Sequence, residues 1–151
     1  MRINKVALLI AFAIASVLFM EVVAHADEAD QSIKITFSRA IEIPGQILPA
    51  GTYLFKLADP NDLDIVRIFN SQGTRLYATL QTLTAERAKP TGEAVVVLAG
   101  QPEGRPETLL KWFYPGDTSG HELVYPKQEE QQLAQARRQT IVANETAQAG
   151  D

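Results

Sequence analysis

Residues 33–38 read Ile-Lys-Ile-Thr-Phe-Ser, a strict alternation of apolar and polar side chains. Successive side chains of a β-strand point to opposite faces, so this period of two predicts a half-buried strand. The three apolar side chains would face a core and the polar ones solvent. The stretch 41–43 can extend the strand before Pro44 and Gly45 impose a turn.

Six further stretches have the length and composition of short strands, and turn-forming residues separate them. They are residues 52–57, 63–69, 74–83, 93–98, 108–114 and 122–125. The apolar run within 93–98 lacks alternation, which predicts burial on both faces. The turn Asn-Ser-Gln-Gly at 70–73 predicts an antiparallel hairpin between the strands that flank it. About seven short strands therefore predict a mainly β fold, an antiparallel sandwich or small barrel over residues 32–125.

The strand pattern ends at Pro126, and residues 126–143 are predicted to form a C-terminal α-helix. Proline suits the first turn of a helix, and the following residues lack glycine, proline and aromatic side chains. Acidic residues lie early in this segment and Arg137 and Arg138 lie late, a polarity that complements the helix dipole. The apolar stripe is weak, so we expect the helix to dock loosely or to serve a partner. Residues 144–151 are expected to form a disordered tail.

The first 26 residues have the pattern of a signal peptide. Arg2 and Lys5 precede an apolar run, and Ala24-His25-Ala26 then matches the small-x-small sequence that signal peptidase cleaves. The chain is therefore expected to be exported to the periplasm or secreted. It would begin at Asp27, with residues 27–31 as a mobile N-terminus.

A retained leader that anchors the chain in a membrane is the alternative interpretation of this segment, because residues 6–23 approach the length of a bilayer span. Glu21 disfavours that alternative, since a carboxylate near the bilayer centre costs about 2.5–3.5 kcal/mol. No cysteine follows the apolar run, so the sequence offers no lipoprotein anchor.

Composition narrows the possible partners of the exported chain. Without Arg2, Lys5 and Glu21, it keeps 12 basic and 17 acidic residues, a net charge of −5. Nucleic acid and anionic membranes are therefore disfavoured as partners, because phosphate binding needs clustered lysine and arginine. The chain has no cysteine, so its stability must come from packing or from a partner, not from disulfides.

The segment 111–122 gathers the chain's one tryptophan and the one histidine that would remain after cleavage. If its side chains form a surface, an aromatic platform with polar tips could stack a sugar or a peptide ring. The candidate binding residues of this platform are Trp112, Tyr114, Asp117, His121 and Glu122. The alternative is that Trp112 and Tyr114 fill the core while the polar residues only shape a turn.

A catalytic or metal site would have to use His121 with Asp117 or Glu122. Neighbours on a strand point to opposite faces, so Asp117 is the better partner. Ser119 lacks the Gly-x-Ser-x-Gly elbow of a nucleophile. A zinc site would need about three protein ligands, which His121 and scattered carboxylates do not readily supply. The carboxylates at 59, 62 and 64 depart from a calcium loop at Pro60. We therefore expect no catalytic residue, metal or cofactor.

Two motifs resemble those of uncharacterised small exported bacterial proteins, frequent in soil bacteria such as the Acidobacteria. They are Leu-Pro-Ala-Gly-Thr-Tyr at 48–53 and the pair Trp-Phe-Tyr-Pro-Gly at 112–116 with Gly-His-Glu-Leu-Val-Tyr-Pro-Lys at 120–127. The resemblance implies a bacterial exported β-domain and no catalytic residue. The expected function is thus a non-enzymatic binding or envelope-associated module whose partner is a protein or a glycan. The alternative is a small hydrolase or metal-dependent enzyme using His121.

Overall fold

The computed structural model describes residues 22–27, 31–101, 104–136 and 138–142. These residues form eleven strands and one helix, α2. The elements, in chain order, are β1 (Val22–Asp27), β2 (Ser32–Phe37), β3 (Ile41–Ile43), β4 (Gln46–Leu48), β5 (Gly51–Asp59), β6 (Asp62–Asn70), β7 (Leu76–Glu86), β8 (Val95–Ala99), β9 (Glu107–Phe113), β10 (Ser119–Leu123), α2 (Lys127–Gln135) and β11 (Arg138–Val142). The mainly β fold is therefore confirmed.

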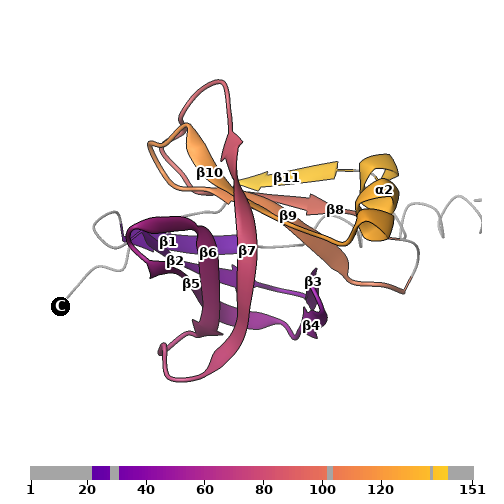
Figure 1. Ribbon diagram of the computed structural model, residues 1–151, viewed down its shortest axis with the longest axis horizontal. Coiled ribbons are helices and arrows are strands. Elements are labelled where there is room, and N and C mark those ends of the chain that lie inside the picture. Colours follow the sequence, from indigo (N-terminus) through magenta and orange to yellow (C-terminus); the bar gives the residue numbers. More distant parts are fainter. Residues whose placement is uncertain (1–21, 28–30, 102–103, 137, 143–151) are drawn as a thin grey trace, which may run out of the picture.

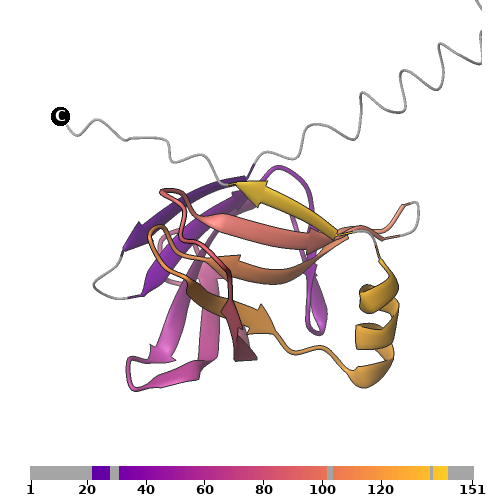
Figure 2. The same ribbon diagram turned by 90° about the horizontal axis from the view of Figure 1, so that it is seen from above.

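The strands form one sheet that folds over on itself into two layers (Figure 1). One layer runs β1-β2-β5-β6, and the other contains β10, β9, β8 and β11. The long strand β7 belongs to both layers, because it pairs with β6 in one and with β10 in the other. Every pairing is antiparallel except that of β3 with β9. The sheet is not closed, so the fold is sandwich-like, and the helix α2 lies at one end of it (Figure 2).

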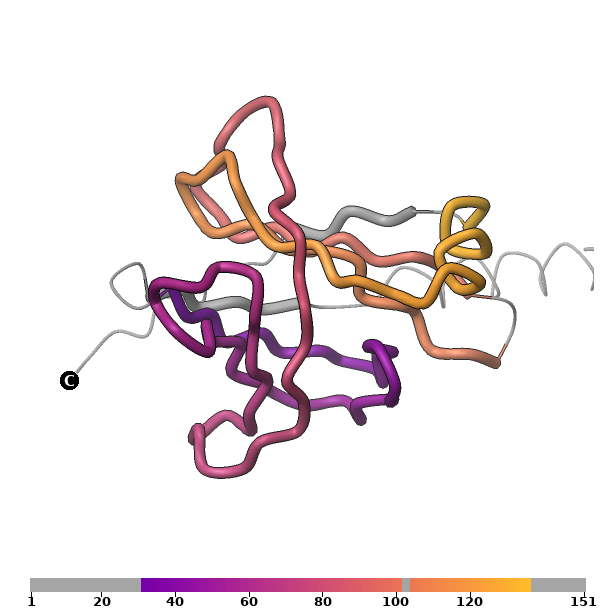
Figure 3. The backbone as a smooth tube through the Cα atoms, viewed as in Figure 1, coloured from indigo at the N-terminus to yellow at the C-terminus, as the bar shows by residue number. Residues whose placement is uncertain are grey.

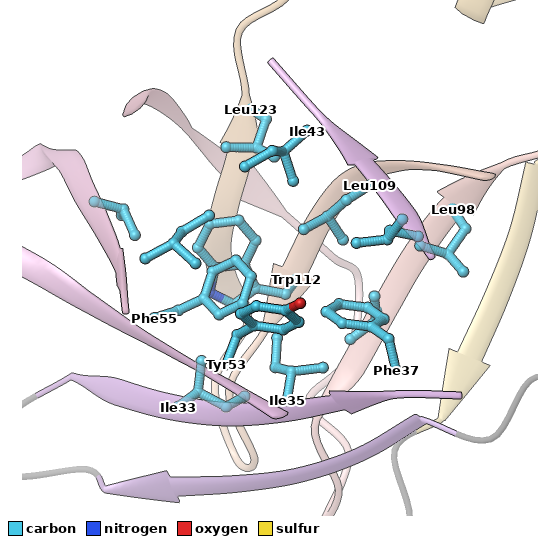
Figure 4. Packing of buried hydrophobic residues seen from close by; sticks show 14 of the residues in the cluster. Ile33, Ile35, Phe37, Ile43, Tyr53, Phe55, Leu98, Leu109, Trp112 and Leu123 are labelled. Carbon is cyan, nitrogen blue, oxygen red and sulfur yellow. The ribbon is translucent and has the colours of Figure 1, made fainter. Parts of the chain in front are cut away.

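The core fills the space between the layers with side chains from alternating strand positions. Ile33, Ile35 and Phe37 of β2 are at most 1% exposed, as their spacing predicts. The other layer contributes Trp112, whose ring centroid lies 5.1 Å from that of Phe55 (Figure 4). All five residues of β8 are buried, so the predicted burial on both faces is confirmed.

Leu-Pro-Ala-Gly-Thr-Tyr at 48–53 has a structural explanation. Leu48 is buried in the core, and the next residues turn the chain from β4 into β5. The hydroxyl of Tyr53 then donates a hydrogen bond back to the carbonyl of Pro49. The motif therefore fixes the corner between two strands.

Three strand assignments differ from the sequence prediction in detail. The stretch 41–43 does not extend β2 but forms β3, which pairs with β4 through the predicted turn at Pro44 and Gly45. The strand β4 itself was not predicted. The strand β10 begins at Ser119, inside the expected turn, because Gly120 pairs with Phe113. The predicted hairpin of β6 and β7 is confirmed.

The helix predicted over 126–143 is wrong in its second half. Helix α2 ends at Gln135, and Ala136 already has an extended backbone with ψ of 150°. Residues 138–142 form β11, which pairs with the edge of β8 from Arg138 opposite Ala99 to Val142 opposite Val95. The β-branched residues of Arg-Gln-Thr-Ile-Val suit a strand, and an open sheet edge supplies its hydrogen-bond partners. Arg138 therefore lies in a strand and not in the last turn of the helix, while Arg137 lies outside the described residues. The tail at 144–151 lies outside the described residues.

The C-terminal end of the expected leader is a strand. Strand β1 covers the whole of β2, from Val22 opposite Phe37 to Asp27 opposite Ser32. Asp27 is thus paired, and Gln31, also in the expected mobile N-terminus, lies in a turn. The described part of the chain has no helix long and apolar enough to cross a bilayer. The residues before 22 lie outside the described part.

Gly120→Ala should disrupt the contact of β10 with β9. An added Cβ would overlap the carbonyl oxygen of Trp112 and lie 2.7 Å from Cδ1 of Phe113. We expect a loss of about 3 kcal/mol in the free energy of unfolding, measured by urea denaturation. Gly92→Ala is the control, because nothing lies within 4 Å of its Cβ position. Equal stability of the two variants would contradict this account of Gly120.

Candidate functional site

The turn between β9 and β10 contains Tyr114 and Asp117, and the other three candidate residues lie on the two strands that flank it. Gly116 has a φ of +77°, which residues with a side chain rarely adopt, and so allows the tight reversal. The amide of Asp117 donates a hydrogen bond to the carbonyl of Tyr114 across this turn. The turn is therefore a fixed structure and not a loose loop.

Arg87 ties the same turn to the loop that follows β7, and the two lie next to each other (Figure 3). Its guanidinium donates to the carbonyls of Asp117 at 2.7 Å and Tyr114 at 2.9 Å. A third bond, of 2.9 Å, reaches the hydroxyl of Thr91, and the guanidinium also lies over the ring of Phe113. A planar group with several fixed donors suits this role better than a lysine would. The sequence analysis did not identify Arg87, since only the tertiary structure brings these acceptors together.

The predicted aromatic platform is not a surface. Trp112 is 0% exposed and Tyr114 is 6% exposed, and both belong to the core cluster. The hydroxyl of Tyr114 donates to the carbonyl of Gln31 at 3.1 Å. The structural interpretation of these two residues is therefore confirmed, and their assignment as exposed binding residues is wrong. The reason is that β9 lies in the middle of the second layer, where one face must cover the core.

His121 is an interior residue, 6% exposed, between the rings of Trp112 and Tyr114. Its Nδ1 lies 3.3 Å from the hydroxyl of Thr82, which is also buried. Burial lowers the pKa of His121 below its ordinary value, and the Asp64 carboxylate offsets this effect only in part. The imidazole is therefore neutral at pH 7.

A small cleft of about 70 Å³ opens beside this turn. Tyr114, Asp117, Ser119 and His121 all line it, so the structure brings three of the five predicted binding residues to one place. Glu122 is not among them: it is exposed, while its neighbour His121 points into the interior. The proposed pairing of His121 with Glu122 is thus wrong, because the two side chains point to opposite faces of β10.

Two carboxylates of the turn from β5 to β6 have a structural role. Asp59 accepts a hydrogen bond from the amide of Asn61, and Asp62 accepts one from the amide of Asp64, so these residues shape the turn from β5 to β6. Within the described ranges, no three His, Asp or Glu side chains are grouped closely enough to hold a metal ion.

A second hollow, a groove of about 160 Å³, lies between α2 and the strands β9 and β10. Its lining consists of Leu110, Lys111, Glu122, Leu123, Tyr125, Glu130, Leu133 and Ala134. The charged residues come from both the sheet and the helix, and Leu123, Tyr125 and Leu133 are buried. Of the two hollows, this groove has the larger volume and could hold part of a peptide or a sugar.

Helix α2 is attached to the sheet by few contacts. Leu133 is its one buried side chain, 7% exposed. The residues Gln128, Gln131, Gln132 and Gln135 form an exposed polar stripe on the helix. Of the weak apolar stripe predicted for this segment, Leu133 is the member that α2 buries against the sheet. The other groove residues on α2, Glu130 and Ala134, were not identified from the sequence.

Comparison of the chain with protein-family models, with curated proteins and with solved structures gives no match. The functional argument therefore rests on the residues and geometry described above.

His121 should make stability depend on pH. Its pKa is lower in the folded protein than the ordinary value of about 6.5, so the unfolded chain takes up a proton first as the solution is acidified. The contribution of neutral His121 is complete above about pH 6.5 and is lost as the pH falls below that value. We expect the urea midpoint to fall from pH 7 to pH 5 by less in His121→Gln than in the wild type. The same fall in both proteins would contradict this prediction.

Proposed function

We propose that this protein is an exported, non-enzymatic β-domain that binds a component of the bacterial envelope, a glycan or a protein. The signal-peptide pattern and the resemblance of its two motifs to exported bacterial domains support export. The burial of Trp112 and Tyr114 moves the proposed binding surface away from the predicted platform. The groove between α2 and the sheet takes its place.

The observation that carries this proposal is the loose attachment of α2 beside an open groove. Because Leu133 is the one buried side chain of α2, the polar stripe of the helix and the groove stay accessible together. Lys111 and Glu122 are cross-strand neighbours at the groove, and Glu130 lies across from them on the helix. A ligand with hydrogen-bonding groups and a small apolar surface fits this mixture of charged and apolar lining residues.

Filling the groove should abolish binding. We expect soluble peptidoglycan fragments or oligosaccharides to raise the unfolding temperature, because a ligand that binds only the folded state stabilises it, by about 2.7 kcal/mol at 100 times Kd. Ala134→Trp should remove this stabilisation, since Ala134 lines the groove. The measurement is thermal unfolding of protein recovered from a bacterial periplasm.

The matched control is Gln131→Trp, which places the same side chain on the exposed stripe outside the groove. It should keep the response to the ligand. Two results would contradict the proposal of a glycan-binding groove. One is stabilisation that persists in Ala134→Trp, and the other is a wild-type unfolding temperature that no peptidoglycan fragment or oligosaccharide raises.

A hydrolase that uses His121 with Asp117 is the second candidate, and one observation favours it: both residues line the same cleft as Ser119. A neutral imidazole can accept a proton, but its Nδ1 already lies near Thr82. This candidate requires hydrolysis of a simple ester that is lost in both His121→Gln and Asp117→Asn. Activity that survives either substitution, or no hydrolysis by the wild type, would exclude it.

A further inference from the structure

The edge of the first layer is the feature that the proposed function leaves unexplained. Strand β2 pairs on one side with β5 and on the other with β1, which is the last strand of that layer. All six residues of β2 have a partner in β1. The structure therefore shows that this edge accepts an antiparallel strand along its full length.

Cleavage of the signal peptide during the proposed export would remove β1 from the edge of β2. Hydrolysis of the peptide bond between Ala26 and Asp27 by one water molecule gives a carboxylate on Ala26 and an amine on Asp27. Of the six residues of β1, only Asp27 stays with the exported chain. The backbone groups of β2 that faced β1 are then unpaired.

Without β1, β2 is an edge strand whose unpaired backbone groups can form hydrogen bonds with another strand. Its inner face consists of the buried residues Ile33, Ile35 and Phe37, and Lys34 is its one charged residue. An uncovered edge strand tends to pair with another strand unless charges, proline or a bulge oppose it, and β2 has only the single charge of Lys34. The sequence of β2 contains no proline, and its register with β5 runs without a bulge.

We infer that removal of the leader opens β2 and that a second copy of the chain covers it, with the two β2 strands antiparallel about a twofold axis at Ile35. This inference rests on the proposed export. The pairing places Ile33 opposite Phe37 and Lys34 opposite Thr36, so no like charges face each other. A twofold axis at Lys34 would instead place the two lysines opposite each other. In this pairing the layer continues from one copy into the other, and the inner faces of both copies lie on the same side of that continuous layer.

Two substitutions at Thr36 test this register with opposite signs. Thr36→Lys places a second lysine opposite Lys34 twice in the dimer, whereas Thr36→Glu forms two oppositely charged pairs. Both variants lose the same 2.7 Å hydrogen bond between the hydroxyls of Thr36 and Thr52, so each controls for the other. We expect Thr36→Lys to raise the dimer Kd by about 2- to 30-fold and Thr36→Glu to lower it by a similar factor.

The experiment expresses the full chain with its own leader in a bacterium and recovers the periplasmic protein. Intact mass gives the N-terminus, sedimentation equilibrium gives the dimer Kd, and circular dichroism checks that both variants fold. A chain that begins at Asp27, forms dimers and responds to Thr36 as stated supports the inference.

Three outcomes would overturn the inference, and they are distinguishable. A periplasmic chain that retains its N-terminus would keep β1 on the edge of β2, and the inference would fall although the chain is exported. A monomer that begins at Asp27 would leave export intact and remove the dimer. A dimer whose Kd is the same in both Thr36 variants would use a different surface.

Discussion

The contact between Trp112 and Phe55 holds the two layers of the sheet together. Trp112 comes from β9 and Phe55 from β5, and their rings meet edge to face at a centroid distance of 5.1 Å. Removing a buried aromatic side chain of this size typically costs about 3–5 kcal/mol, a large share of the stability of a domain without disulfides. The position of Trp112 also fixes β10, because Gly120 must lie directly against its carbonyl oxygen. The turn, the clamp by Arg87 and the interior position of His121 all follow from this arrangement.

Because the aromatic residues pack in the core, the surfaces that remain accessible to a partner lie at the periphery of the domain. The residues that seemed most suited to stacking a ligand are the ones that close the sandwich, so they are not free to bind. One peripheral feature, the groove beside α2, is open, and the proposed export would open a second, the edge of β2. They lie on different elements, α2 with β9 and β10 in one case and β2 in the other. A dimer through β2 would therefore not use the residues that line the groove.

Local sequence patterns correctly predicted the elements whose structure depends on residues close to them along the chain. The alternation in β2, the apolar run of β8 and the hairpin of β6 and β7 each depend on neighbours along the chain. The prediction was wrong where the outcome depends on a distant partner. Residues 138–142 have a sequence compatible with helix or strand, and the free edge of β8 decides for the strand. In the same way, the stretch 41–43 becomes β3 because β9 and β4 are present beside it.

The candidate site also has a part that nearby residues predict and a part that contacts between distant segments decide. From the sequence alone, the residues near the turn at 115–120 were identifiable as a group, and three of them, Tyr114, Asp117 and His121, do line one cleft. Which of them face solvent was not predictable, because both faces of β9 carry large apolar side chains and contacts with distant segments bury Trp112 and Phe113 alike. The groove and the role of Arg87 come from residues far apart in the chain. By itself the sequence determined the β class, the strand periodicity and the expectation of export, since these depend on short-range pattern. Only the tertiary structure decided which faces, edges and hollows are available to a partner, because burial depends on contacts between distant segments.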